Sequence, residues 1–313
     1  MIRNGFIVTA AACAALATVL PGASAASDGW QRVGTGITGG VSGLALVEGA
    51  PAGLDRVDAV VVRDNKAEDQ SRVASVSLRP GRAPVVRELT WRGALPKDLE
   101  AVDAVPGRPG HYVALASRGE AYHFVVAGGR ATVRRGPVAL PGRHDGDNYE
   151  AFALHLDRSG RTYAVWATRG SGPEKAVVGA ARVRIGADGL EFGTVTARQE
   201  FSVPFPDRDE VRHISDLKVR ADGTVLVSAA SDPNVDDGPF ASAVYEAGRF
   251  RVNHAHDAVL RLEPEGSLVP LVRFTRRDNR KIEAVAALPR GLGLWGTDDE
   301  NFGGSLRFDR VGR

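Results

Sequence analysis

The amino-acid sequence predicts an all-β fold built from repeated units, and three observations lead to that prediction. Short runs of alternating apolar and polar residues, the pattern of half-buried strands, follow one another along most of the 313-residue chain. Turns rich in Gly, Pro and Asp separate these runs, and no convincing 3.6-residue period indicates a helix. One short phrase recurs five times, which indicates that the strands are grouped into similar units.

The first 25 residues predict a secretory signal peptide that is not part of the fold. Arg3 supplies a short positive region, "FIVTAAACAALATVL" (6–20) an apolar run, and "ASA" (23–25) a cleavage site with small residues. The apolar run is too short and too rich in Ala for a good membrane span. Cys13, the only cysteine, lies inside this run, so the mature chain has no thiol and no disulfide. We expect a secreted protein, extracellular or periplasmic.

Residues 26–313 are expected to form one β-propeller domain, and the repeated phrase is the reason. Each copy places an apolar residue before Glu or Ser, followed by a small or short residue and alternating apolar positions. The copies are "VSGLALV" (41–47), "LEAVDAV" (99–105), "YEAFALH" (149–155), "ISDLKVR" (214–220) and "IEAVAAL" (282–288). A turn and a second strand follow each copy. Units of roughly 45–65 residues with four strands are typical of propeller blades.

The sequence therefore predicts a five-bladed β-propeller of four-stranded antiparallel blades. The last unit has only three strands after residue 281, so the N-terminal strand "GWQRVGT" (29–35) is expected to supply the fourth and to close the ring. Closure removes the free sheet edges that a disulfide-free exported β protein has to avoid. Six blades with one degenerate unit, or a β-sandwich, are the alternatives that the repeat leaves open.

The Glu or Ser of each repeat is expected at the centre of the ring, because the first strand of a blade lines the axis. These five residues are Ser42, Glu100, Glu150, Ser215 and Glu283. Three converging carboxylates repel one another and raise their own pKa values unless a cation lies between them. Ca²⁺, which takes six to eight oxygen ligands, suits such a set. The alternative is that each Glu merely begins its strand and faces solvent.

In their order around five blades, these residues resemble the calcium-activated nucleotidases, the soluble apyrases. The resemblance implies a five-bladed propeller in which the same five residues bind a central calcium. It does not extend to nucleotide specificity, because "LASRGEAYH" (115–123) stands where that family has Gly-Leu-Gly-Lys-Glu-Trp. The "EA" phrases are also similar to phytase-like and lactonase-like secreted propellers, which use a central calcium for ester chemistry.

The ends of the second strands are expected to surround the same site, because adjacent strands of a blade are antiparallel. Three arginines in one register, a possible clamp for a phosphate or carboxylate group, are Arg63, Arg118 and Arg169. Three carboxylates at these ends, candidates for a general base or for further ion ligands, are Asp64, Asp298 and Asp299.

Two functions remain open from the sequence. The first is a secreted, calcium-dependent hydrolase of a phosphate (nucleotide-like) or other anionic ester, in which the metal activates water. The second is a non-catalytic ligand-binding propeller in which calcium is structural. The formal net charge of +2 leaves no basic excess for nucleic acid or a membrane surface, so we expect a monomer with a small anionic substrate or ligand. Convergence of the arginines and the carboxylates on one pocket would favour the hydrolase.

Overall fold

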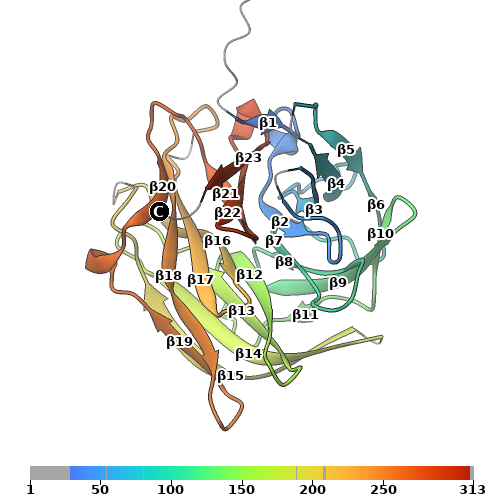
Figure 1. Ribbon diagram of the computed structural model, residues 1–313, viewed down its shortest axis with the longest axis vertical. Helices are drawn as coiled ribbons and strands as arrows, with labels where there is room; N and C mark the ends of the chain where they lie inside the picture. The colour runs from blue at the N-terminus through green and yellow to red at the C-terminus, as the bar shows by residue number, and fades with distance from the viewer. Residues whose placement is uncertain are drawn as a thin grey trace, which may run out of the picture.

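The computed structural model describes residues 29–310, apart from 54, 80, 188, 207, 208 and 234. These residues form five antiparallel sheets arranged in a ring around a central axis (Figure 1). The prediction of a five-bladed β-propeller is confirmed, and neither a sixth blade nor a sandwich is seen in this part of the chain. The expected signal peptide (1–25), with Cys13, lies outside the described residues.

Blades 1 and 2 follow the predicted order of strands from the axis outward. Blade 1 consists of β2 (Gly43–Leu46), β3 (Val57–Val62), β4 (Val73–Leu78) and β5 (Val85–Glu88). Blade 2 consists of β7 (Leu99–Ala104), β8 (His111–Ala116), β9 (Glu120–Ala127) and β10 (Arg130–Val133). Two short additions extend blade 2: β6 (Thr90–Arg92) pairs parallel with β10, and β11 (Val138–Ala139) pairs with β9.

Blades 3 and 4 have the longest outer strands. Blade 3 consists of β12 (Tyr149–Leu156), β13 (Thr162–Thr168), β14 (Ala176–Gly186) and β15 (Gly189–Phe201). Blade 4 consists of β16 (Val211–Val219), β17 (Thr224–Ser231), β18 (Ser242–Val252) and β19 (Ala258–Leu262), with β20 (Pro270–Phe274) also paired to β18. The short 3₁₀ turns η1 (Ile37–Gly39), η2 (Glu265–Ser267) and η3 (Glu300–Phe302) complete the described elements.

The N-terminal strand closes the ring, as predicted. Blade 5 consists of β21 (Ile282–Leu288), β22 (Leu292–Thr297), β23 (Ser305–Arg310) and the two-residue strand β1 (Gln31–Arg32). Gln31 pairs antiparallel with Leu306, and the N–H of Val33 donates to the carbonyl of Gly304 at 2.9 Å. The two ends of the described chain therefore share one sheet, in which the first residues of the fold supply the outer edge of the last blade.

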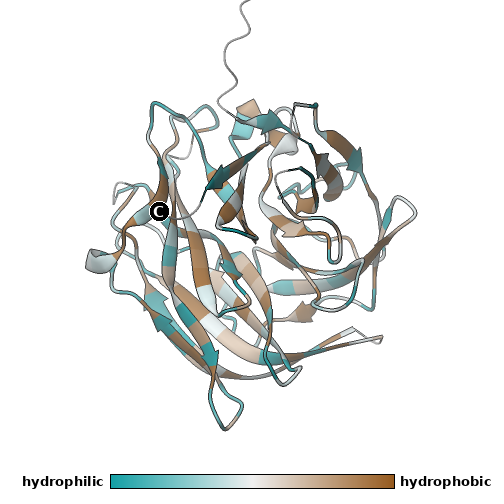
Figure 2. Ribbon diagram, viewed as in Figure 1, coloured by the Kyte–Doolittle hydropathy of each residue, from teal (hydrophilic) through white to brown (hydrophobic). Residues whose placement is uncertain are grey.

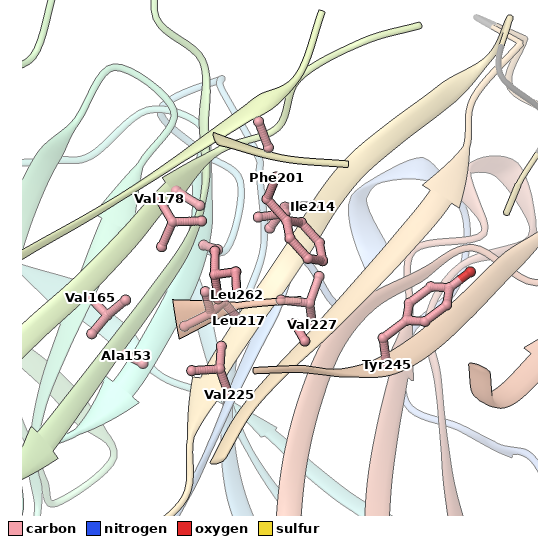
Figure 3. Close-up of a cluster of buried hydrophobic side chains, with 14 of the residues drawn as sticks. Ala153, Val165, Val178, Phe201, Ile214, Leu217, Val225, Val227, Tyr245 and Leu262 are labelled. Carbon is pink, nitrogen blue, oxygen red and sulfur yellow. The ribbon is translucent and has the colours of Figure 1, made fainter. Parts of the chain in front are cut away.

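Five separate apolar cores hold the blades together, one between each pair of neighbouring sheets. The largest lies between blades 3 and 4, where Val165 and Val178 meet Leu217 and Val225 (Figure 3). Burying a Val or Leu side chain completely contributes about 1.5–3 kcal/mol. The second strands read as continuous apolar runs because both of their faces are covered: all eight residues of β17, "TVLVSAAS", are buried.

The hydropathy of the chain follows this layout. Hydrophobic residues lie mainly along the strands, and many connecting turns are hydrophilic (Figure 2). The turn "ADG" between β16 and β17 shows why glycine ends such turns. Gly223 has φ +85°, and a Cβ there would lie 2.3 Å from the carbonyl oxygen of Phe250. Over residues 29–310, with the gaps given above, no helix has the length and apolar character needed to cross a membrane.

Candidate active site

The three glutamates of the repeated phrase lie at β-bulges, at the same place in three inner strands. In β12, Tyr149 pairs with Thr168 and Ala151 with Ala167, which leaves Glu150 as an extra residue without a partner in the ladder. The pairing shifts in the same way around Glu100 in β7 and Glu283 in β21. A bulge re-aims its extra side chain and is often found beside active sites. The bulge therefore explains why the sequence repeats Glu at this position and why the side chain turns toward the axis.

The residue after each glutamate is small because the inner strands lie close together. Ala101, Ala151 and Ala284 are fully buried there. In blade 1 the equivalent residue is Gly43, whose added Cβ would lie 2.8 Å from the Cα of Ala101. The five inner strands contact one another in cyclic order around the axis. The repeated "EA" thus combines a side chain that leaves the ladder with one small enough to let neighbouring blades meet.

A polar cavity of about 380 Å³ opens where the inner strands begin, and we call it the axial mouth. Its acidic lining residues are Asp64, Asp98, Glu100, Glu150, Glu283, Asp298 and Glu300. Its basic lining residues are Lys66, Arg169, Arg212 and Lys281. With every group ionised, the lining has an excess of three negative charges. Asn65, Asn148 and Gln70 add neutral polar groups.

Two basic side chains that the sequence analysis did not select hold one side of the axial mouth. Arg212 donates from Nη1 to Oε1 of Glu283 at 3.2 Å and also pairs with Asp232. Lys281, 2% exposed, lies with Nζ 3.1 Å from Glu283 and 3.5 Å from Asp232, and it also contacts Glu300. These two cations give Glu283 the counter-charge that a metal ion was expected to supply.

Burial dominates the acid–base behaviour of the mouth. It raises the pKa of Glu150 to about 7, a rise that the charges of Arg212 and Arg169 oppose and that of Glu283 supports. The pKa of Glu100 is raised well above its ordinary range by burial and by the neighbouring charges of Glu150 and Asp64. Burial also raises the pKa of Glu283, against the opposing charges of Lys281 and Arg212. Burial thus makes all three carboxyl groups resist ionisation, and the close ion pairs of Glu283 with Lys281 and Arg212 oppose that effect at Glu283.

Asp298 belongs to the same coupled group of acids. Burial and the charge of Glu283 raise its pKa well above the ordinary value, and the charge of Lys281 opposes the rise. Burial is the largest influence on Lys281 and lowers its pKa, but the charges of Glu283, Asp298 and Glu300 together raise the pKa above its ordinary value, so that the ammonium form is held. A strongly shifted set of titratable groups in one cavity is a common property of catalytic sites.

The three arginines of the predicted anion clamp do not meet. Arg63 is 2% exposed and donates to the carbonyls of Gly39 and Gly40, the latter at 2.9 Å, so it anchors the turn at η1. Arg118 is exposed outside the axial mouth. Only Arg169 lines it, with Nη1 3.8 Å from Oε1 of Glu150. The position after the second strand does not fix where a long side chain goes, because each arginine turns to its own local acceptors.

The predicted carboxylates divide in the same way. Asp64 and Asp298 line the axial mouth. Asp299 is buried outside the lining, where it accepts from Nη1 of Arg280 at 2.7 Å and from the N–H of Lys281 at 2.8 Å. Asp299 thereby holds the backbone of Lys281, the lysine that pairs with Glu283, and supports the cavity without lining it.

The five predicted calcium ligands are only partly brought together. Glu100, Glu150 and Glu283 line the mouth, whereas Ser42 and Ser215 lie buried behind the lining. Ser42 Oγ accepts the N–H of Asp64 at 3.2 Å, and Ser215 Oγ has no hydrogen-bond partner among the described residues.

The fit of this donor set to a divalent cation is poor. Arg212 and Lys281 stand against Glu283, and the described residues contain no group of three or more His, Cys, Asp or Glu side chains arranged to hold a metal. Calcium binding stays a prediction of the sequence.

A second charge cluster lies at the opposite end of the axis, and we call it the axial base: the buried Asp216 and Lys218 together with the half-buried Asp103. Lys218 donates from Nζ to the carbonyl of Val102 at 3.0 Å, to that of Phe152 at 3.3 Å and to Asp216 at 3.3 Å. Asp216 accepts the N–H of Val285 at 2.9 Å, and Asp103 accepts that of Leu154 at 2.8 Å. These bonds join blades 2, 3, 4 and 5.

Signals for the missed residues exist in the sequence. Only five lysines follow the expected signal peptide, among many arginines, and two of them, Lys218 and Lys281, are buried at the axis. A lysine retained beside the repeated phrase of an arginine-rich chain is therefore a stronger signal than any one arginine. Arg212 precedes the fourth phrase by two residues, but nothing in its neighbourhood distinguishes it from the other arginines.

Comparison with known proteins gives the fold and no family. No protein-family model matches the chain, and no curated protein matches it. A thermostable family-43 glycoside hydrolase has a similar structure, with 12% identity, 90% of this chain and 92% of that chain covered, and a TM-score of 0.50.

Two further solved structures have TM-scores of 0.49. A mutant of the α-L-arabinanase of Cellvibrio cellulosa is 12% identical over 90% of this chain and 92% of that chain. An exo-β-1,3-galactanase from Clostridium thermocellum is 10% identical over 91% of this chain and 63% of that chain. The family-43 glycoside hydrolase named first is neither an apyrase nor a phytase, and at 12% identity it shows likeness of fold alone. Of the predicted resemblance, the five-bladed β-propeller is confirmed.

Proposed function

We propose that this protein is a secreted hydrolase that cleaves a glycosidic bond in the axial mouth, with Glu150 as general acid and Glu283 as the ionised partner. The observation that carries the proposal is the unequal support of two buried glutamates in one cavity. Glu283 forms ion pairs with Lys281 at 3.1 Å and Arg212 at 3.2 Å, whereas the ion pair of Glu150, with Arg169, is longer at 3.8 Å, and the charge of Arg212 also acts on Glu150. Most glycoside hydrolases use one protonated and one ionised carboxyl group.

The protonated role fits Glu150. Its pKa, raised to about 7 by burial, lies near the pH at which an exported enzyme works. A general acid is most effective when its pKa is close to the working pH, because a large fraction of it is then protonated and the proton is still acidic enough to be transferred. In the reaction Glu150 donates this proton to the glycosidic oxygen, and the bond from that oxygen to the anomeric carbon breaks.

The ionised role fits Glu283. Burial raises the pKa of Glu283 as well, but its two close cationic partners oppose that rise and favour the carboxylate. Water adds to the anomeric carbon and gives up a proton that Glu283 accepts, so the products are two free sugar hydroxyl compounds and the protons balance. Glu100, whose pKa is raised well above the ordinary range, stays neutral beside Glu150 and does not compete as a base.

The charge of the cavity favours a neutral substrate over a phosphate ester. Seven acidic and four basic residues line it, and Arg212 and Lys281 already pair with carboxylates. A phosphate group would meet a net negative lining and no unpaired arginine clamp, whereas sugar hydroxyls both donate and accept hydrogen bonds. The neighbours named above are glycoside hydrolases, which supports a carbohydrate by analogy of fold only.

The test compares two kinds of leaving group. The wild type and its variants are assayed on 4-nitrophenyl α-L-arabinofuranoside, β-D-xylopyranoside and β-D-galactopyranoside and on the matching disaccharides. Glu150→Gln should lower kcat on a disaccharide by about a hundredfold or more, because an alkoxide leaves poorly without a proton. The same variant should lose far less on the nitrophenyl glycoside, whose leaving group needs no acid. Glu283→Gln should lose activity on both.

The control is Glu191→Gln, since Glu191 is exposed on β15 and pairs with Arg184 on the surface. It should behave as the wild type. Absence of hydrolysis of every glycoside between pH 4 and 9 would contradict the proposal and favour the non-catalytic ligand-binding propeller. Equal losses by Glu150→Gln on both kinds of leaving group would remove Glu150 from the role of acid.

A further inference from the structure

A second cavity, of about 560 Å³, lies over blade 3 beside the axial mouth, and we call it the blade-3 cavity. The segment 141–149 and the strands β13, β14 and β15 line it. Asn148 and Arg169 line both cavities. These two residues therefore form the boundary between them, and a ligand that extends out of the axial mouth past Asn148 enters the blade-3 cavity.

Asn148 presents an acceptor that the described part of the chain does not satisfy. Its Oδ1 atom is buried and has no hydrogen-bond partner there. The backbone around it is fixed, because the N–H of Arg169 donates to the carbonyl of Asn148 at 3.0 Å. A buried polar atom without a partner costs about 1–3 kcal/mol, so such an atom at the junction of two cavities indicates a donor supplied by a ligand.

The floor of the blade-3 cavity is aromatic. Tyr149 and Trp166 line it, each 4% exposed. The indole of Trp166 lies against Gly179, where an added Cβ would be 2.8 Å from Nε1, so only glycine leaves room for the ring at this place. Aromatic and apolar walls with a few fixed polar groups are typical of small-molecule sites, and sugars place their C–H faces on such walls.

The charges of this cavity balance, unlike those of the axial mouth. Asp147 and Glu174 oppose Arg169 and Arg198. The carboxylate of Asp147 is already used within the segment, since it accepts the hydroxyl of Tyr149 at 2.8 Å and the N–H of His144 at 2.7 Å. A lining without net charge selects a neutral polar group and not a phosphate or a uronic acid.

We propose that the blade-3 cavity is a second sugar-binding subsite, so that the substrate is a neutral oligosaccharide bound across Asn148. A hydroxyl group of the chain donates to Asn148 Oδ1, and the next sugar unit lies on Trp166. This inference rests on the proposed glycosidase function for its catalytic readout, but binding at the subsite is measurable without any hydrolysis.

The first experiment fills the cavity. Val195 is 37% exposed on β15 and lines the blade-3 cavity, so Val195→Trp should occupy the subsite while the fold is kept. The matched control is Val269→Trp, because Val269 is 72% exposed in blade 4, outside both cavities. Calorimetric titration of arabinotriose, xylotriose and β-1,3-galactotriose into Glu150→Gln protein should show binding of one of them. Val195→Trp in that background should weaken it about tenfold or more, and Val269→Trp should not.

The second experiment removes the acceptor. Asn148→Ala should lower kcat/KM for the trisaccharide about tenfold more than for the 4-nitrophenyl monosaccharide, which corresponds to one lost hydrogen bond. Equal losses on the two substrates would overturn the subsite and leave the glycosidase function standing. Trisaccharide binding that Val195→Trp weakens, in a protein that hydrolyses no glycoside, would support the subsite and overturn the glycosidase function. Trisaccharide binding that is unchanged by Val195→Trp would also overturn the subsite.

Discussion

The two ends of the axis each contain a buried lysine, and the two lysines are held in opposite ways. At the axial base, Lys218 donates to two backbone carbonyls and one carboxylate, and the aspartates there accept backbone N–H groups. At the axial mouth, Lys281 is surrounded by the carboxylates of Glu283, Asp232 and Glu300, beside an open cavity. A cavity opens at each end, but the charged groups of the base bond to the backbones of several blades, whereas those of the mouth pair mainly with one another.

This difference between the axial base and the axial mouth separates the charged groups that stabilise the fold from those that are suited to chemistry. Groups bonded to the backbone of several blades cannot change protonation without loosening the ring. Groups paired mainly with other side chains can gain or lose a proton while the strands stay in place. Unfavourable burial of like charges at the mouth is then a cost in stability that natural proteins accept at active sites.

The largest expected effect follows removal of the lysine at the base. Lys218→Met should lower the free energy of unfolding by about 3–5 kcal/mol at pH 8, because the buried Asp216 would lose its ion-pair partner and the half-buried Asp103 a nearby cation. For a chain of this size the melting temperature should fall by roughly 10 °C. Thermal unfolding measures it. Lys175→Met, which removes an exposed pair with Glu200, should change stability by less than about 0.5 kcal/mol.

The second prediction contrasts two carboxyl groups whose pKa values burial raises to about 7, Glu150 at the mouth and Asp216 at the base. Since the folded state holds the Glu150 proton more tightly than the unfolded state, this group lowers stability as pH rises from about 4.5 to 7. Glu150→Gln should therefore match the wild type at pH 4 and exceed it at pH 8, by about 3 kcal/mol at most.

Asp216→Asn should instead destabilise the protein at pH 8, because Lys218 would lose its carboxylate partner. Urea unfolding at both pH values separates the two cases. If both variants gain stability at pH 8, the base is as strained as the mouth, and the contrast between the two ends is wrong.

The third prediction concerns the ionised partner at the mouth. Lys281→Met removes one of the two cations that oppose the rise in the pKa of Glu283. The acid limb of the pH–activity profile should move to higher pH by on the order of one unit, because Glu283 has to be ionised. Hydrolysis of a 4-nitrophenyl glycoside measures this limb without interference from Glu150. An unmoved limb would assign it to another group.

The smallest expected effect is that of calcium. Arg212 and Lys281 already pair with Glu283, so adding Ca²⁺ to chelated protein should raise the melting temperature by less than about 1 °C. A rise that grows with calcium concentration and disappears in Glu150→Gln would restore the five-residue calcium site that the sequence predicts.

The sequence was sufficient for the architecture because repetition is visible without any knowledge of contacts. Period-2 runs, turns and the five phrases predicted five blades and the closing strand, since each of these is a local pattern. The sequence did not predict that β1 has only two residues, or that the strands β6, β11 and β20 are added to the blades. Short pairings at the edge of a sheet depend on the neighbouring strand and not on their own residues.

The site was predictable only where the backbone alone aims the side chain. Glu100, Glu150 and Glu283 line the axial mouth because a bulge in the inner strand turns each of them inward. Arg63 and Arg118 were wrongly placed in the cavity from the register of their strands. Several rotatable bonds separate a guanidinium from the strand that carries it, so the strand does not determine where the charge lies. The pairing of Arg212 with Glu283 of the next blade depends on tertiary structure, and no local sequence pattern indicates it.

Because each of the three glutamates is an extra residue in its strand, the ladder on either side is complete without it. Shortening an inner strand by that one residue would leave the neighbouring pairs in register and the blade intact. The chemistry of the mouth can therefore be exchanged during evolution, or in the laboratory, one blade at a time, while the ring keeps its pairing and its cores.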